Sequence, residues 1–168
     1  NIKNINKKIV WLDRLKFINN NPSIIIANEF FDCFPIRQFY KKNNIWFEKM
    51  IEFDTHNQFL KYKDTEIKDN QTLSYIKFYK PNDILEVSKL RENYFLTACK
   101  YLNSFGGIMI IFDYGYFDRP KNFTLQSIFN NKYSNILDNI GCQDITSLVD
   151  FRSLIDIAKK NKLKIDFF

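Results

Sequence analysis

Residues 22–32 have the sequence Pro-Ser-Ile-Ile-Ile-Ala-Asn-Glu-Phe-Phe-Asp, and residues 106–115 have the sequence Gly-Gly-Ile-Met-Ile-Ile-Phe-Asp-Tyr-Gly. Each stretch begins with turn residues, continues as an apolar run and stops at polar residues. A short apolar run bounded in this way is typical of a strand that is buried on both faces, as strands of parallel sheets are. We therefore expect residues 24–27 and 108–112 to form adjacent parallel strands.

Two helices and a further strand are predicted around this pair. Residues 90–105 carry apolar side chains near helical spacing and stop at a glycine pair. Residues 150–161 have an apolar face and lysines near their end, and residues 163–168 form a strand-like apolar stretch. Helices that alternate with strands predict an α/β fold with a doubly wound sheet, in which ligands bind outside the carboxyl ends of the strands.

A mainly β insertion is predicted over residues 39–88. Residues 45–53 and 59–62 flank a polar turn at 54–57, which indicates an antiparallel hairpin. Residues 84–87 add a third short strand. The only histidine, His56, falls in the turn and is more typical of a surface position than of a catalytic base.

The composition is that of a folded domain. The chain has 168 residues, of which 45% are hydrophobic and 26% charged, so residues 1–168 are expected to form one domain or part of one. No apolar run approaches the ~20 residues of a membrane span.

The net charge is +6, but acidic residues are interspersed with the lysines, so no nucleic-acid partner is expected. Three widely separated cysteines, Cys33, Cys99 and Cys142, indicate reduced thiols and no metal site.

Polar side chains follow both predicted strands. Asn28, Glu29 and Asp32 follow the first strand, and Asp113 and Tyr114 follow the second. Adjacent parallel strands would bring these groups to one cleft at the same edge of the sheet. From composition alone, capping and turn-stabilising roles are the more common ones for such residues. The chain has four glycines, and none forms a GxGxxG or P-loop pattern that would hold a nucleotide.

Residues 28–39, Asn-Glu-Phe-Phe-Asp-Cys-Phe-Pro-Ile-Arg-Gln-Phe, closely resemble the NEFFDALP-[IV]-xQF motif of the MidA-like family of S-adenosylmethionine-dependent methyltransferases. This family includes the mitochondrial methyltransferase that acts in complex I assembly. Other segments match the family's motifs in the same order: Trp11 to Leu15, Trp46 with Glu48, Ile84 to Ser88, Gly106 with Gly107, Asp113 to Gly115, Thr124 to Gln126, Asp144 to Thr146 and Val149 to Phe151. The resemblance covers nearly the whole chain.

The resemblance implies a class I methyltransferase (Rossmann-like) fold, of which this chain is a part with a β-rich insertion. The departures at Cys33, Phe34, Lys89 and Leu148 are mild. The family's glycine-rich cofactor loop and ribose-binding acidic residue precede the first residue of this sequence, and its final strands follow the last. The implied cofactor is S-adenosyl-L-methionine, and we expect the isolated chain to bind it weakly or not at all.

The resemblance also implies roles for the strand-end residues. Glu29 and Asp32 would hold an arginine side chain of a partner protein in charge-assisted hydrogen bonds and align it for methyl transfer, as catalytic residues. Asn28, Asp113 and Tyr114 would complete the substrate pocket.

A cofactor role is implied for Trp11 and Asp13, which would lie beside the adenine. The implied partner is a protein substrate, such as a subunit of respiratory complex I. The implied compartment is the cytoplasm of an AT-rich bacterium or the mitochondrial matrix. The alternative is a truncated, non-catalytic remnant or an assembly factor that binds its partner without transferring methyl groups.

Overall fold

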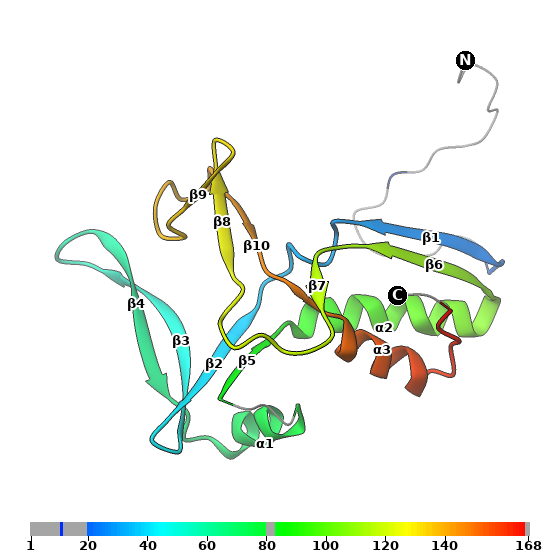
Figure 1. Cartoon of the computed structure of the whole chain (residues 1–168), viewed down its shortest axis with the longest axis horizontal. Coiled ribbons are helices and arrows are strands. Elements are labelled where there is room, and N and C mark those ends of the chain that lie inside the picture. Colours follow the sequence, from blue (N-terminus) through cyan, green and yellow to red (C-terminus); the bar gives the residue numbers. More distant parts are fainter. Residues whose placement is uncertain (1–10, 12–19, 80–82, 167–168) are drawn as a thin grey trace.

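The computed structural model describes residue 11 and residues 20–79 and 83–166 (Figure 1). The strands are β1 (Ser23–Asn28), β2 (Arg37–Lys42), β3 (Ile45–Asp54), β4 (Phe59–Glu66), β5 (Ile84–Val87), β6 (Gly107–Phe112), β7 (Gly115–Tyr116), β8 (Gln126–Phe129), β9 (Lys132–Ser134), β10 (Asp144–Thr146) and β11 (Val149–Asp150). The helices are α1 (Asn70–Phe78), α2 (Lys89–Phe105) and α3 (Phe151–Lys160).

Strands β1 and β6 are parallel neighbours, which confirms the prediction for residues 24–27 and 108–112. Their register runs from Ser23 opposite Gly107 to Asn28 opposite Phe112, so the two strands end side by side. Gly107 allows the backbones of the two strands to lie close together where they begin. Gly107 has a φ of +121°, and a Cβ at this position would lie 2.0 Å from the carbonyl oxygen of Ser23. Only glycine fits such a position without moving the backbone.

Both long helices pack against one face of this pair (Figure 1). Ala27 of β1 and Met109 of β6 join Phe95 of α2 and Leu154 of α3 in one apolar cluster. The prediction that both faces are buried is wrong for the described residues, because the described helices lie on the same side. The opposite face exposes five large apolar side chains, with Ile24 72% and Phe112 58% exposed: Ile24, Ile26, Ile108, Ile110 and Phe112.

The two predicted helices are confirmed, and their caps explain where they begin. The side chain of Ser88 caps α2 by accepting from the amide of Arg91, and Asp150 caps α3 by accepting from the amide of Ser153. The strand predicted over 163–168 is wrong for residues 163–166, which pair with no strand in the described chain. Within this segment, Leu163 and Ile165 pack against the apolar cluster formed by β1, β6, α2 and α3. Residues 167 and 168 lie outside the described ranges.

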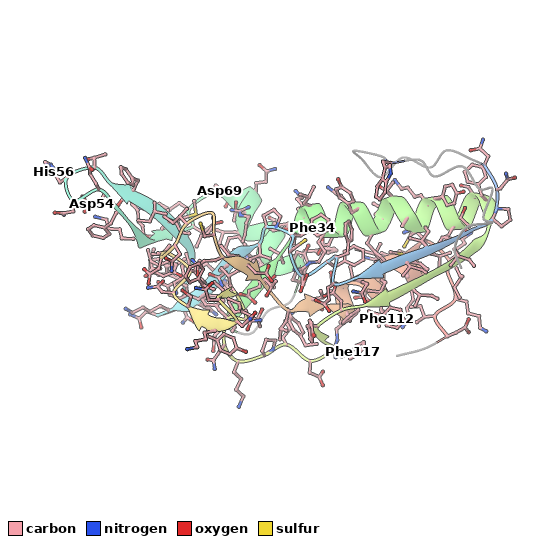
Figure 2. All side chains as sticks on the ribbon, turned by 90° about the horizontal axis from the view of Figure 1, so that it is seen from above. Phe34, Asp54, His56, Asp69, Phe112 and Phe117 are labelled. Atoms are coloured by element: carbon pink, nitrogen blue, oxygen red, sulfur yellow. The ribbon has the colours of Figure 1, made fainter. Side chains whose placement is uncertain are left out.

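The predicted hairpin is confirmed as β3 and β4, and β5 joins the same four-stranded sheet in the order β4-β3-β2-β5. The hairpin forms an arm that projects from the rest of the molecule (Figure 1), with Asp54 and His56 at its tip (Figure 2). Strand β2 and helix α1 were not predicted. They form a second core with β5, in which Phe39, Ile76 and Leu85 are fully buried.

Two further sheets are built from short strands. Strands β10, β8 and β9 form a three-stranded antiparallel sheet, and β11 pairs with β7 in parallel. These strands are two to four residues long and were not predicted, because they are too short to show an alternating pattern. The β7–β11 pair brings residues 147–150 next to the carboxyl end of β6.

Replacing Gly107 with alanine tests the close start of β1 and β6. The new methyl group collides with the Ser23 backbone in a left-handed conformation, so we expect a loss of about 3 kcal/mol or more in the free energy of unfolding. Gly141→Ala is the matched control, since Gly141 also has a positive φ but open space around it, and about 1–2 kcal/mol is expected there. Urea denaturation measures both, and equal losses would contradict the close contact.

Candidate functional site

The chain turns sharply where β1 ends. The amide of Glu29 donates to the carbonyl of Phe112 at 2.8 Å, which prolongs the β1–β6 pairing by one step. Glu29 then adopts a φ of +44°, a left-handed conformation that is unfavourable for a residue with a side chain. Such conformations are kept mainly where the surrounding structure enforces them, and they are common at functional sites. The side chain of Glu29 is exposed at this turn.

Asp113 holds the loop that follows Glu29. Its Oδ2 accepts from the amides of Phe30 at 3.1 Å and Phe31 at 2.8 Å, and its Oδ1 accepts from the amide of Tyr114 at 2.9 Å. Three backbone donors on one carboxylate tie the ends of β1 and β6 to the same side chain. This geometry gives Asp113 a structural task, which is to fix the loop that carries Glu29 and Asp32.

Asp32 is buried next to other acidic groups. It is 7% exposed, and no described residue donates a hydrogen bond to its carboxylate. Burial raises the pKa of Asp32 above its ordinary value, and the charges of Asp113, Asp144 and Glu29 raise it further, while Arg91 opposes them. The carboxylate oxygens of Asp32 still reach the surface, so a ligand can contact them, but the surrounding acidic groups make the ionised form costly. The site therefore favours a cation that brings hydrogen-bond donors.

Asp144 is a site residue that was not predicted. It lies in β10, and its charge reaches Asp32 because the amide of Ser147 donates to the carbonyl of Asp32 at 2.9 Å. Asp144 belongs to one of the segments that resemble the family's motifs. Its place at the site depends on the packing of residues 144–150 against the loop, which no local pattern indicates.

The remaining predicted residues have different surroundings. Asn28 ends β1 and is exposed, and Tyr114 is exposed directly after Asp113. The structure thus brings the five predicted strand-end residues to one edge. Trp11 is 92% exposed, and its predicted place beside the adenine stays a prediction. Asp13 lies outside the described residues.

An aromatic cluster packs the loop after β1 against helix α2. The ring of Phe30 contacts the rings of Phe31 and Phe34 with centroids 5.2 Å apart, and Phe34 lies 5.1 Å from the ring of Tyr94 on α2. Figure 2 shows Phe34 near one end of α2, and Phe112 marks the nearby end of β6. Edge-to-face contacts of this kind give a rigid apolar base to the acidic edge.

Two glycines near the candidate site are explained by contacts between strands. A Cβ on Gly107 would meet the Ser23 backbone, and a Cβ on Gly115 would lie 2.4 Å from the carbonyl oxygen of Val149. These two glycines therefore serve strand contacts and not a cofactor. Two small cavities lie around Tyr79, Glu92 and Arg91 and around Tyr116, and neither is lined by Glu29, Asp32 or Asp113. No group of three metal-ligating side chains is present in the described ranges.

A family model described as "Putative S-adenosyl-L-methionine-dependent methyltransferase" matches residues 1–168. The mitochondrial protein arginine methyltransferase NDUFAF7 of Xenopus laevis is 27% identical to the chain over 151 residues, which are 86% of this chain and 33% of the relative. The Caenorhabditis elegans homologue of NDUFAF7 is 26% identical over 154 residues, which are 90% of this chain and 36% of the relative. The chain thus spans about a third of the length of these relatives.

Solved structures support the same fold. A Burkholderia thailandensis protein crystallised with bound S-adenosyl-homocysteine superimposes with a TM-score of 0.72 at 18% identity, over 90% of this chain and 40% of the other. A second crystal structure from that organism gives a TM-score of 0.73 at 18% identity, over 90% and 42% of the two chains. The predicted methyltransferase fold is confirmed by these matches. In the described residues, no helix is long and apolar enough to cross a membrane.

Asp32→Asn tests whether the ionised carboxylate of Asp32 lowers the stability of the folded chain. The folded-state pKa of Asp32 lies above the ordinary value of 3.8, so the folded chain holds this proton more tightly than the unfolded chain. The ionised form therefore costs stability as pH rises above that value, and the cost levels off above the raised pKa. We expect Asp32→Asn to gain stability over the natural chain as pH rises from 3 to 7, measured by thermal unfolding. A variant that loses stability at neutral pH would contradict this.

Proposed function

The chain belongs to this family of S-adenosyl-L-methionine-dependent methyltransferases, and we propose that it forms the substrate-binding side of a protein arginine methyltransferase. One observation carries the proposal. Asp32 is largely buried and presents a carboxylate with no donor among the described residues, at an edge where the charges of Glu29, Asp113 and Asp144 act on it. The names of the relatives support an arginine acceptor, since they are protein arginine methyltransferases.

A guanidinium group matches this arrangement in charge and shape. It is planar, permanently charged and carries five N–H donors, so it can bind two carboxylates at once. Glu29 and Asp32 would each accept from it, and the charge-assisted bonds would fix the plane of the group. An ammonium group offers only three donors around a point and would be oriented less well.

Positioning is the main contribution of these residues to the reaction. Two carboxylates that hold the guanidinium aim one nitrogen and draw positive charge away from it, which favours attack by that nitrogen. Asp113 contributes indirectly, because it fixes the loop. The cofactor supplies the methyl group, and the residues of the acidic edge act on the acceptor.

The partner and the compartment follow from the family as proposals. We propose a protein substrate, for which a subunit of respiratory complex I is the first candidate. The relatives are mitochondrial proteins, which supports the mitochondrial matrix over the cytoplasm of a bacterium. A partner-binding factor without methyl transfer is the alternative, and the next experiment separates the two.

Glu29→Gln and Asp32→Asn test the acceptor role in a protein that carries this chain together with a complete cofactor-binding part. We expect each to lower transfer of labelled methyl groups to an arginine peptide by roughly 10²-fold, since each removes a charged hydrogen bond in the transition state. Binding of S-adenosyl-homocysteine should change little.

Asp118→Asn is the matched control, because Asp118 is an exposed carboxylate whose one ion-pair partner among the described residues is Arg152. It should keep full activity. Unchanged turnover in both site variants would remove Glu29 and Asp32 from the site. A complete protein that binds its partner and S-adenosyl-homocysteine but transfers no methyl would favour the alternative.

A further inference from the structure

A buried arginine lies directly behind the acidic edge. Arg91 is in the first turn of α2 and is 5% exposed. Its Nε donates to the carbonyl of Phe31 at 2.6 Å, its Nη2 donates to the Oγ of Ser147 at 2.8 Å, and its Nη1 donates to the carbonyl of Leu148 at 3.3 Å. One guanidinium thus joins α2, the loop after β1 and the segment before β11.

These contacts hold the backbone of Asp32 on both sides. The carbonyl that precedes Asp32 belongs to Phe31 and accepts from Arg91, and the carbonyl of Asp32 itself accepts from the amide of Ser147. Ser147 is in turn held by Arg91 through its hydroxyl. The amide of Phe31 is bound by Asp113. The peptide groups around Asp32 are therefore fixed from two directions.

Arg91 differs from the other described arginines in its partners. Arg37, Arg119 and Arg152 each form an ion pair with a carboxylate at 4.0 Å or less. Arg91 donates only to carbonyl and hydroxyl oxygens among the described residues, although it is the most buried of the four. A buried cation without a paired carboxylate is expensive. The carboxylates whose charges act on Arg91 are Asp113, Glu86 and Asp32, besides the phenol of Tyr116, so two of the three carboxylates belong to the acidic edge.

We propose that Arg91 is a positioning residue that holds the Asp32 carboxylate in place for a substrate guanidinium and offsets the negative charge of the acidic edge before the substrate binds. This inference rests on the proposed acceptor role of Asp32. It adds a second task, which is to keep Asp32 ionised although Asp113, Asp144 and Glu29 surround it. Without the charge of Arg91, the acidic edge would hold a proton more readily and bind a cation less well.

The test uses two readouts on the chain as it stands, with ethylguanidinium as the probe. The first is the titration of the Asp32 carboxyl carbon by NMR, and the second is the dissociation constant of ethylguanidinium from chemical-shift changes. We expect Arg91→Gln to raise the pKa of Asp32 and to weaken ethylguanidinium binding by about tenfold, as for loss of one charge-assisted contact. Arg91→Lys should restore the charge but not the three-way contact, and should recover the pKa more than the affinity.

Two further variants keep the test decisive if Arg91→Gln does not fold. Ser147→Ala removes one acceptor of Arg91 and leaves the Ser147 amide on Asp32, so we expect a smaller loss of affinity with a preserved fold. Arg152→Gln is the matched control, because it removes a surface arginine paired with Asp118, and it should change neither readout. If Arg91→Lys and Ser147→Ala leave both readouts unchanged, Arg91 is only a structural residue and the proposal is wrong.

Failure of the acceptor site itself gives a different result. If Asp32→Asn also leaves ethylguanidinium binding unchanged, the proposed function fails, and Arg91 has no substrate-binding carboxylate to position. If Asp32→Asn abolishes binding while the Arg91 variants do not affect it, the proposed function stands and the role of Arg91 falls.

Discussion

Two backbone amides after β1 donate to the carboxylate that follows β6, and this contact sets the geometry of the whole edge. The parallel register ends with Asn28 opposite Phe112, so Asp113 lies beside the loop that leaves β1. Its oxygens bind the amides of Phe30 and Phe31 and turn the chain back toward α2. Without this contact, the left-handed turn at Glu29 would lose the hydrogen bonds that hold the residues after it. The aromatic cluster, the buried Asp32 and the contacts of Arg91 all follow from the path that the loop takes from there.

The acidic edge is arranged for binding more than for stability. Burial and the neighbouring charges of Asp113 and Asp144 raise the pKa of Asp32, and no described residue donates a hydrogen bond to its carboxylate. Arg91 opposes them from the interior, and burial lowers its own pKa. Such groups reduce the stability of the fold, and pairs of perturbed titratable groups are concentrated at functional sites. A cationic substrate would offset both costs when it binds.

The sequence was sufficient to predict the parts of the fold that depend on local patterns. The apolar runs predicted β1 and β6. Apolar positions at helical spacing, with a glycine pair after one helix and lysines near the end of the other, predicted α2 and α3. The strand-end rule placed Glu29, Asp32 and Asp113 at one edge. The open face of β1 and β6 was not predicted, because an apolar run indicates burial of a strand but not which chain segment covers each face.

The finer roles within the site depend on tertiary contacts that leave no local pattern. Asp113 was predicted to bind substrate, yet its oxygens bind backbone amides, which depends on the register of two strands 80 residues apart. Arg91 lies in a first helical turn, where an arginine is usually exposed. Asp144 reaches the site only because residues 144–150 pack on the loop.

The central claim is that the loop fixed by Asp113 presents Asp32 and Glu29 to a substrate guanidinium. The most direct test is a crystal structure of a protein that joins this chain to a complete cofactor-binding part. The crystal should contain bound S-adenosyl-homocysteine and an arginine peptide. We predict guanidinium nitrogens within about 3.2 Å of a carboxylate oxygen of Asp32 and of Glu29. An arginine bound elsewhere, with Asp32 and Glu29 free of it, would contradict the claim.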